Sequence, residues 1–353
     1  MNTLNKLENF FGKISVQFKK YPLLPFITFG ALIMLIAFMP GLNMIRWSTM
    51  SVFAYIVIYT VVALGLNILL GFSGLISLGT AGFVGAGALG TSVFMNMGFP
   101  FGIAVILALV CAGLIGALIG IFSLKVDGIY LAIATLFVGE ILSQIYTQIS
   151  IFGGESLSFE SIKLFGFLEL SNNPQQDRVV LFILITIAMT ICMLIMHNIV
   201  KSRTGRALMA MSRSQHAAQA MGVSLIKYRL TAFILATLFA TFGGALYTLY
   251  FQNVPTRAWT LDLSLFIIAM VVVGGFKSII GTFLGAFIIH GVPNLYLKDY
   301  FGDISYIFSG VLIILVILFY PNGFVYIWYD IKRLYYKFKI RISKRQVKPN
   351  DKG

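Results

Sequence analysis

Charged side chains are scarce in this sequence, and proline is scarcer still. Of 353 residues, 11% are charged and 59% are hydrophobic, whereas about a quarter of the residues in a soluble domain carry charge. That balance excludes a water-soluble globule. The chain has 9 Pro beside 32 Phe and 34 Gly, with no repeated short unit, which excludes the disordered and fibrous classes. The composition therefore indicates a polytopic membrane protein.

Cysteines and catalytic motifs are also few. Cys111 and Cys192 lie within long apolar runs, so the sequence predicts no disulfide framework and no cysteine-ligated metal. There is no HExxH segment, and the only Gly-Lys pair, at Gly12, lacks the other residues of a phosphate-binding loop. We expect no enzymatic activity and no cofactor. If ATP powers transport here, the motor must be another polypeptide.

Ten apolar runs approach the length of a membrane-spanning helix, since about 20 helical residues cross a hydrocarbon core of about 30 Å. The eighth run is short and ends at Gly274 and Gly275, which is typical of a half-span or a re-entrant helix. The sequence thus predicts an all-α bundle of about ten spans. The runs cover residues 23–42, 49–70, 74–96, 99–123, 129–151, 179–200, 228–251, 262–275, 279–297 and 304–320.

Lys and Arg residues predict the orientation of this bundle. The net charge of +14 could indicate nucleic acid binding, but the basic residues lie between and beyond the apolar runs rather than on one soluble face. With both termini in the cytoplasm, 21 of the 26 Lys and Arg lie inside, in agreement with the positive-inside rule. We therefore expect cytoplasmic termini and no nucleic acid partner. The five outside are Arg46, Lys163, Arg178, Arg257 and Lys298.

The two ends of the chain differ from the spans between them. Residues 1–22 form a polar, amphipathic segment, residues 23–320 contain the spans, and residues 321–353 form a basic tail. At both ends apolar residues recur at helical spacing beside lysines, which is typical of helices that lie on the membrane surface. The spans are joined by short connections, apart from an outer loop at residues 152–178 and an inner loop at residues 201–229.

Few polar residues lie inside the predicted spans. Glu140 is the only carboxylate near the middle of one, and Gln144 and Thr147 follow on the same helical face. Because a charge in mid-bilayer is costly, this face should turn toward protein or a water-filled path. Glu140 could line a translocation route or clamp two helices together, and the sequence leaves both open.

Several glycines recur at four-residue spacing, which is typical of helices that approach each other closely. We expect these stripes to serve packing rather than ligand contact. They are Gly82 with Ala86 and Gly90, Gly116 with Gly120, and Gly281 with Gly285.

Residues 71–74, GFSG, have the GxSG form of intramembrane serine proteases. A serine nucleophile needs a base within hydrogen-bond reach, and the sequence places neither His197 nor His290 beside Ser73. Gly and Ser are also common in turns. We therefore interpret these residues as a turn between two spans.

The inner loop is too long for a simple connection and is rich in Ala and Met. Apolar residues recur in it at helical spacing, flanked by Arg206 and Arg213, until Gly222 ends the run. The pattern predicts a short helix beneath the membrane with an apolar face. That face could fit a groove on a partner or lie on the membrane, and the residues alone leave both open. It comprises Ala207, Ala210, Met211, Ala217, Ala218 and Met221.

Residues 216–222, HAAQAMG, resemble the EAA loop of permease subunits of ATP-binding-cassette (ABC) importers. Two alanines are followed by a glycine at the proper distance, although His216 occupies the position of the usual Glu. The resemblance implies that a short coupling helix docks on a separate ATPase. The coupling residues would be Arg206, His216, Ala217, Ala218 and Gly222.

Other segments resemble the branched-chain amino-acid permease family, specifically the M-type of its two membrane subunits. The likeness runs from about residue 50 to Gly323, although Lys277 replaces a usual Gly and residues 153–157, GGESL, depart from the usual outer turn. The similar motifs are GLN at 65–67, SLG at 77–79, GIYLA at 128–132, TGRALMA at 204–210, KYRLTAF at 227–233, GGALY at 243–247 and the glycines of 274–285.

This likeness implies a heteromeric importer in the bacterial cytoplasmic (inner) membrane. The chain would pair with a second permease, receive branched-chain amino acids from an extracytoplasmic binding protein at the outer loop, and be driven by two cytoplasmic ATP-binding subunits. Asn67, Ser73 and Glu140 are the candidates for the polar lining of the path. Two alternatives stay open. Related permeases carry urea or short amides, and an ion-coupled secondary transporter is disfavoured by the single midplane carboxylate.

Overall fold

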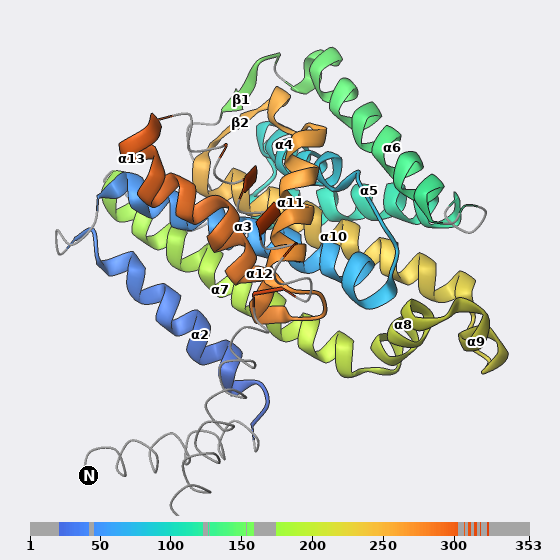
Figure 1. Cartoon of the computed structure of the whole chain (residues 1–353). Coiled ribbons are helices and arrows are strands. Elements are labelled where there is room, and N and C mark those ends of the chain that lie inside the picture. Colours follow the sequence, from blue (N-terminus) through green and yellow to red (C-terminus); the bar gives the residue numbers. More distant parts are fainter. Residues whose placement is uncertain are drawn as a thin grey trace, which may run out of the picture.

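Over the residues that it describes, the computed structural model of the chain is mostly helical (Figure 1). Residues 1–20, most of the predicted tenth span and most of the basic tail lie outside the described residues, so the surface helices predicted there stay predictions. The structure describes residues 21–41, 46–122, 126, 128–152, 154–158, 174–302, 307, 310–311, 314–315, 318 and 323–324.

Each of the first nine predicted apolar runs contains helix. The long elements are α2 (Leu24–Met34) continued by η1 (Leu35–Phe38), α3 (Trp47–Asn67) continued by η2 (Ile68–Ser73), α4 (Thr80–Asn96), α5 (Phe101–Phe122), α6 (Ile129–Gln148), α7 (Pro174–Lys201), α10 (Leu225–Phe251), α11 (Leu261–Gly274), and α12 (Ile279–Ala286) continued by η5 (Phe287–Gly291), η6 (Pro293–Leu297) and α13 (Lys298–Phe301).

Within the described part of the chain, six helices are long and apolar enough to cross a membrane. They are α5, α6, α7, α10, α3 with η2, and the helical run Ile279–Leu297. The helical bundle is therefore confirmed, whereas ten spans and cytoplasmic termini stay predictions. α11 has 14 residues, as expected from the short eighth run, and it ends where Gly275 adopts a φ of 105° that an L side chain rarely takes.

The centre of the bundle is α10, which packs against α3, α4 and α5. Small residues permit this packing, because a methyl group at Gly87 of α4 would overlap the carbonyl of Thr241, and one at Gly244 of α10 would overlap that of Val84. Thr248 adds a hydrogen bond between the same helices by donating to the Ala88 carbonyl at 2.8 Å.

The predicted glycine stripes do serve packing. Gly116 and Gly120 of α5 face α10, while Gly281 and Gly285 of α12 face α11. Gly82 lies against Gly139, so the backbones of α4 and α6 are in direct contact there. These contacts account for the four-residue spacing without any ligand.

Two features depart from the predicted spans. α4 begins at Thr80 rather than near residue 74, and the non-helical residues before it follow the π-helical turn η2, which ends at Gly74 with φ 71°. The connections that follow α6 and α10 also contain a small antiparallel sheet, in which β1 (Ser156–Ser158) pairs with β2 (Asn253–Pro255). The fold is thus helical apart from these two strands in the described ranges.

Candidate coupling site and membrane path

The inner loop folds as two short helices. α8 (Arg203–Arg213) and α9 (Gln215–Ala220) are separated at Ser214, whose backbone is extended, with φ −161° and ψ 116°. The Ser214 hydroxyl accepts a hydrogen bond from the Ala217 N–H at 3.3 Å and so caps α9. The single helix predicted here is therefore wrong, because this cap starts a second helix in a new direction.

α8 turns its apolar face toward the protein itself. Ala207, Leu208 and Met211 are buried, and the helix contacts η2, α7 and α10. This part of the predicted apolar face is therefore covered by the same chain. Arg206 lies on the opposite, exposed side, where its Nη1 donates to the Lys201 carbonyl at 2.9 Å.

α9 is the exposed part of the loop and lies at the edge of the bundle (Figure 1). His216 and Ala217 are exposed, and Met221, just after the helix, is 85% exposed. Gly222 follows with φ 81°, the left-handed conformation in which glycine ends a helical run. Ala218 differs from its neighbours because it is buried.

Arg229 ties α9 to the first turns of α10. Its guanidinium group is buried and donates to Oε1 of Gln215, the first residue of α9. A hydrogen bond to a charged group contributes about 1.5 to 3 kcal/mol, so this contact orients α9. The sequence prediction missed the pair, since helical spacing does not connect a residue in a loop with one in the next span.

The end of α8 meets two turns of the bundle. Ser212 lies beside Gly74, where an added Cβ would be 3.3 Å from Ser212 Cα, and its hydroxyl accepts from Lys277 Nζ at 3.4 Å. The Lys277 N–H in turn donates to Oδ1 of Asn67 at 3.1 Å, and Asn67 Nδ2 donates to the Ser278 carbonyl at 3.2 Å. Contacts therefore run from α8 through the turn between α11 and α12 to the end of α3.

Two candidates for the polar path are buried in this structure. Asn67 is fully buried and uses both ends of its amide in the contacts above. Ser73 is buried as well, and its hydroxyl donates to the Leu69 carbonyl at 2.6 Å. A path-lining role for either residue stays a prediction.

His197 and His290 pack against aromatic rings. His197 lies 5.1 Å from the Phe26 ring, and His290 lies 5.1 Å from the Tyr55 ring, measured between ring centroids. Ser73 instead sits in η2 with its hydroxyl engaged by the local backbone. Its surroundings are those of a turn, as interpreted from the sequence.

The third candidate, Glu140, is exposed on α6. Its Oε1 accepts a hydrogen bond from Nε2 of Gln144, one turn further on, at 3.0 Å. The carboxylate is thus bonded along its own helix rather than to another helix of the described chain. The face that it shares with Gln144 points away from the bundle.

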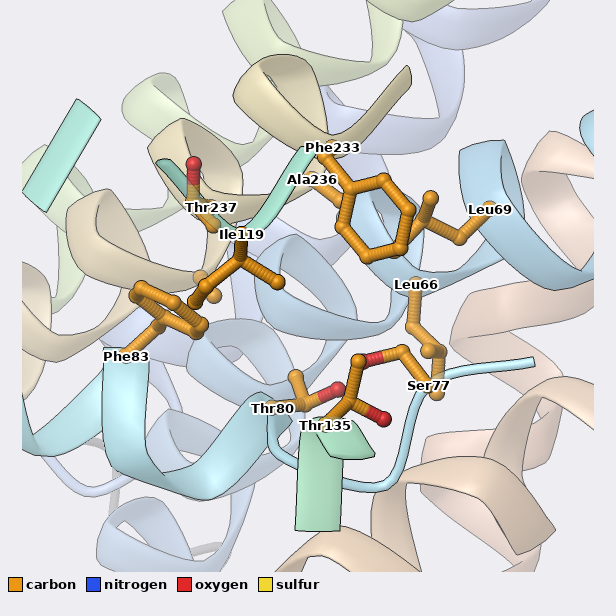
Figure 2. Close-up of a pocket in the computed structure, with 11 residues that line it drawn as sticks. Leu66, Leu69, Ser77, Thr80, Phe83, Ile119, Thr135, Phe233, Ala236 and Thr237 are labelled. Carbon is orange, nitrogen blue, oxygen red and sulfur yellow. The ribbon is translucent and has the colours of Figure 1, made fainter. Parts of the chain in front are cut away.

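A narrow cavity lies where α3, η2, α4, α5, α6 and α10 meet. Figure 2 shows Ser77, Thr80 and Thr135 together at one end, and Phe233 and Ala236 at the other. Its volume of about 10 Å³ is room for about one water molecule. In this conformation the cavity is too small to hold an amino acid.

A family model described as "Branched-chain amino acid transport system / permease component" matches residues 48–317. The chain belongs to this family. The match starts and ends close to the limits predicted from the motifs, residues 50 and 323, and it confirms the family resemblance. The family is one of transport permeases, and the long apolar helices make this member a multi-pass membrane protein.

Individual relatives in the branched-chain amino-acid permease family support the same assignment. The high-affinity branched-chain amino acid transport system permease protein LivM of Escherichia coli is 28% identical over 304 residues, which cover 79% of this chain and 70% of the relative. The LivM protein of Salmonella typhimurium is 29% identical over 305 residues, with the same coverage. No solved structure matches the chain.

One archaeon has two proteins that resemble this chain. The probable LivM protein of Methanocaldococcus jannaschii is 27% identical over 237 residues, which cover 63% of this chain and 67% of the relative. Its probable LivH protein is 30% identical over 142 residues, which cover 38% of this chain and 44% of the relative. The likeness is therefore longer to the M-type protein than to the H-type protein.

Proposed function

We propose that this chain is the membrane-spanning permease subunit of an ABC importer that carries branched-chain amino acids across the cytoplasmic membrane. A soluble binding protein delivers the substrate outside, a second permease completes the path, and two cytoplasmic ATPases supply the energy. The chain has ten spans with both termini in the cytoplasm. The family membership supports this proposal, as do the names of the LivM relatives.

The observation that carries the proposal is the exposed helix α9. His216 and Ala217 of this six-residue helix are exposed, and Met221 beside it is 85% exposed, so that the helix presents small and apolar side chains that fit a groove on a partner. The buried contact between Arg229 and Gln215 holds α9 to α10, so a force on α9 is transmitted to a membrane span. α9 is therefore the part of the inner loop that docks on the ATPase.

α8 carries the same movement further into the bundle. Ser212 touches both the turn after η2 and Lys277, and Asn67 joins Lys277 to α3. A displacement of α8 by the motor would thus shift α3 together with α11 and α12. Alternation between outward-facing and inward-facing states needs such a rearrangement of packed helices.

The docking role is tested by charged substitutions on the exposed side of α9. Ala217→Glu and Met221→Glu should leave expression and membrane insertion unchanged, because both side chains point away from the protein. We expect the ATPase to be lost on purification and ATP-driven uptake to fall at least about tenfold. Met97→Glu is the matched control, since Met97 is a similarly exposed Met at the end of α4. Normal ATPase recovery and uptake in both α9 variants would refute the docking role.

Substitutions at Ala218 and Gly222 test the position and direction of α9 rather than its exposed surface. Ala218 is buried, so a charged residue there would displace the helix before any partner binds. Gly222 has open space around its Cα but a φ of 81°, so Gly222→Pro, which fixes φ near −65°, would change the direction of the chain. Both changes should uncouple ATP hydrolysis from uptake while the protein still inserts.

The substrate is tested by uptake competition in reconstituted vesicles. We expect leucine, isoleucine and valine to compete with one another, and urea not to compete. Vanadate should abolish uptake directly, whereas a proton uncoupler should not. Competition by urea would favour a short-amide permease, and vanadate-resistant, uncoupler-sensitive uptake would replace the importer with an ion-coupled transporter.

A further inference from the structure

The outer face of α6 carries a polar pair in the middle of a membrane span. Glu140 is residue 12 of the 20 in this helix, so it lies about 16 Å along a helix about 30 Å long. Its carboxylate is exposed and accepts a hydrogen bond from Gln144, which is exposed as well. Gln148 follows one turn later on the same side, also exposed. The stripe of Glu140, Gln144 and Gln148 is named the α6 polar stripe.

The outer faces of α5 and α7 differ from this one. Every exposed side chain of α5 is apolar, and so is every exposed side chain of α7 between residues 179 and 197, as expected for helices that face lipid. Among Asp, Glu, Lys and Arg, Glu140 is the only one in the described helices that lies more than five residues from a helix end. The compared residues are Ile103, Ile106, Val110, Leu114, Leu118 and Ile121 of α5, and Ile187, Ile191 and Ile195 of α7.

α6 packs against the bundle on one side only. Its main contact is with α4, with smaller contacts to α11 and to the turn η4 (Thr256–Ala258). The backbones of Gly139 and Gly79 are in direct contact, and the Tyr146 hydroxyl donates to the Gly82 carbonyl at 2.8 Å. Figure 1 shows the helix at the edge of the bundle. The side of α6 that carries Gly139 and Tyr146 therefore packs within the chain, and the polar stripe lies on the opposite side.

Contact with lipid is energetically unfavourable for the α6 polar stripe. A carboxylate at the centre of a membrane helix is costly, and intramembrane carboxylates almost always face protein or water. A soluble binding protein or ATPase cannot reach the middle of the bilayer. The depth of Glu140 thus selects a partner that itself spans the membrane.

We propose that the α6 polar stripe is the surface on which the second permease packs. This inference rests on the proposed function, which supplies such a partner. The Glu140 carboxylate accepts one hydrogen bond from Gln144 and keeps further lone pairs free for a donor on the other permease. Phe137 and Ile141, both exposed beside the stripe, give the apolar contact around it. The seam between the two permeases therefore passes along α6, with the carboxylate in it.

Photo-cross-linking in native membranes tests this assignment. A benzophenone amino acid is placed at Phe137 or Ile141 on α6, and at Leu114 or Leu118 on α5 as equally exposed controls. The full transporter is expressed with an affinity tag on the second permease. We expect the α6 positions to form adducts with the second permease and the α5 positions to form none. Adducts of the α6 positions with lipid alone, or with another copy of this chain, would overturn the proposal.

A substitution at Glu140 gives an independent measurement. Glu140→Leu would help a lipid-facing helix, whereas at an interface it leaves the donor of the second permease without an acceptor. We expect recovery of the second permease to fall about tenfold with Glu140→Leu and to be largely kept with Glu140→Gln. Unchanged recovery with Glu140→Leu would overturn the interface. ATPase recovery and uptake of the unmodified transporter, measured in parallel, show whether the proposed function fails instead.

Discussion

Gly65 provides a quantitative test of the packing between α3 and α10. A Cβ built at Gly65 would lie 2.6 Å from Cβ of Phe239 and 2.9 Å from the Ala236 carbonyl oxygen. Both neighbours are fixed to the α10 backbone, so they cannot turn away. Gly65→Ala therefore requires the two central helices to separate by about 0.8 Å to restore ordinary contact.

The expected cost follows from two opposing effects. Overpacking of a well-packed core costs about 1 to 3 kcal/mol, and replacing Gly by Ala in a helix contributes about 0.8 to 1 kcal/mol in the favourable direction. The net loss is about 0 to 2 kcal/mol. Gly113 of α5 is the matched control, because a Cβ there would be 3.5 Å from Cδ2 of Leu238, which is ordinary contact with a flexible side chain. Gly113→Ala should keep or raise stability.

The assay is thermal unfolding of each purified variant in the same detergent, followed by fluorescence-detected gel filtration. Gly65→Ala should lower the midpoint, and Gly113→Ala should leave it unchanged or raise it. Uptake should follow the same order, since α3 also holds the turn that contacts α8. Equal midpoints for the two variants would show that the α3–α10 distance is not limited by these atoms.

Two further changes test single contacts. Tyr146→Phe removes the hydroxyl that donates to the Gly82 carbonyl and should lower the unfolding midpoint by an amount corresponding to about 1 kcal/mol. The control Tyr130→Phe, at a 76% exposed position, should have no effect. An equal effect of both substitutions would argue against the α4–α6 contact. Lys277 has a φ of 65°, a conformation that costs an L residue about 1 to 2 kcal/mol. Lys277→Gly should therefore be at least as stable as the natural chain, and Lys277→Val should be less stable, because a β-branched side chain is even less favourable there. The same thermal assay checks this order, and a stable Val variant would contradict the left-handed turn.

Long helices and close packing could be predicted from the sequence because each depends on a local pattern. A run of about 20 apolar residues has few alternatives to a membrane helix, and α5 and α10 were found in this way. Glycines spaced by four residues lie on one side of a helix, so the packing role of Gly116 followed from spacing, whereas its partner helix α10 is known from the structure. The unusual backbone at Lys277 is also consistent with the Gly expected there.

Contacts between distant segments could not be predicted in the same way. The helical spacing of Ala and Met continues through Ser214, so the pattern predicted a single helix. In the structure the Ser214 hydroxyl caps a second helix at this point. A serine three residues before Ala217 is a known start signal for helices, and it could have revealed the break. The exposure of Glu140 depends on which side of α6 packs on α4, which the sequence of α6 does not specify. The role of Asn67 required its neighbour at position 277, 210 residues away.

The small sheet anchors the connection that follows α6. Its two strands are paired, and the Thr256 hydroxyl donates to the Gly154 carbonyl at 2.6 Å. These contacts hold the chain in place shortly after the end of α6. Whatever follows Ser158 can then be lengthened, shortened or replaced without pulling on α6, since insertions are tolerated where the flanking backbone is anchored. Changes in the length or sequence of that segment would therefore leave the spans in their places.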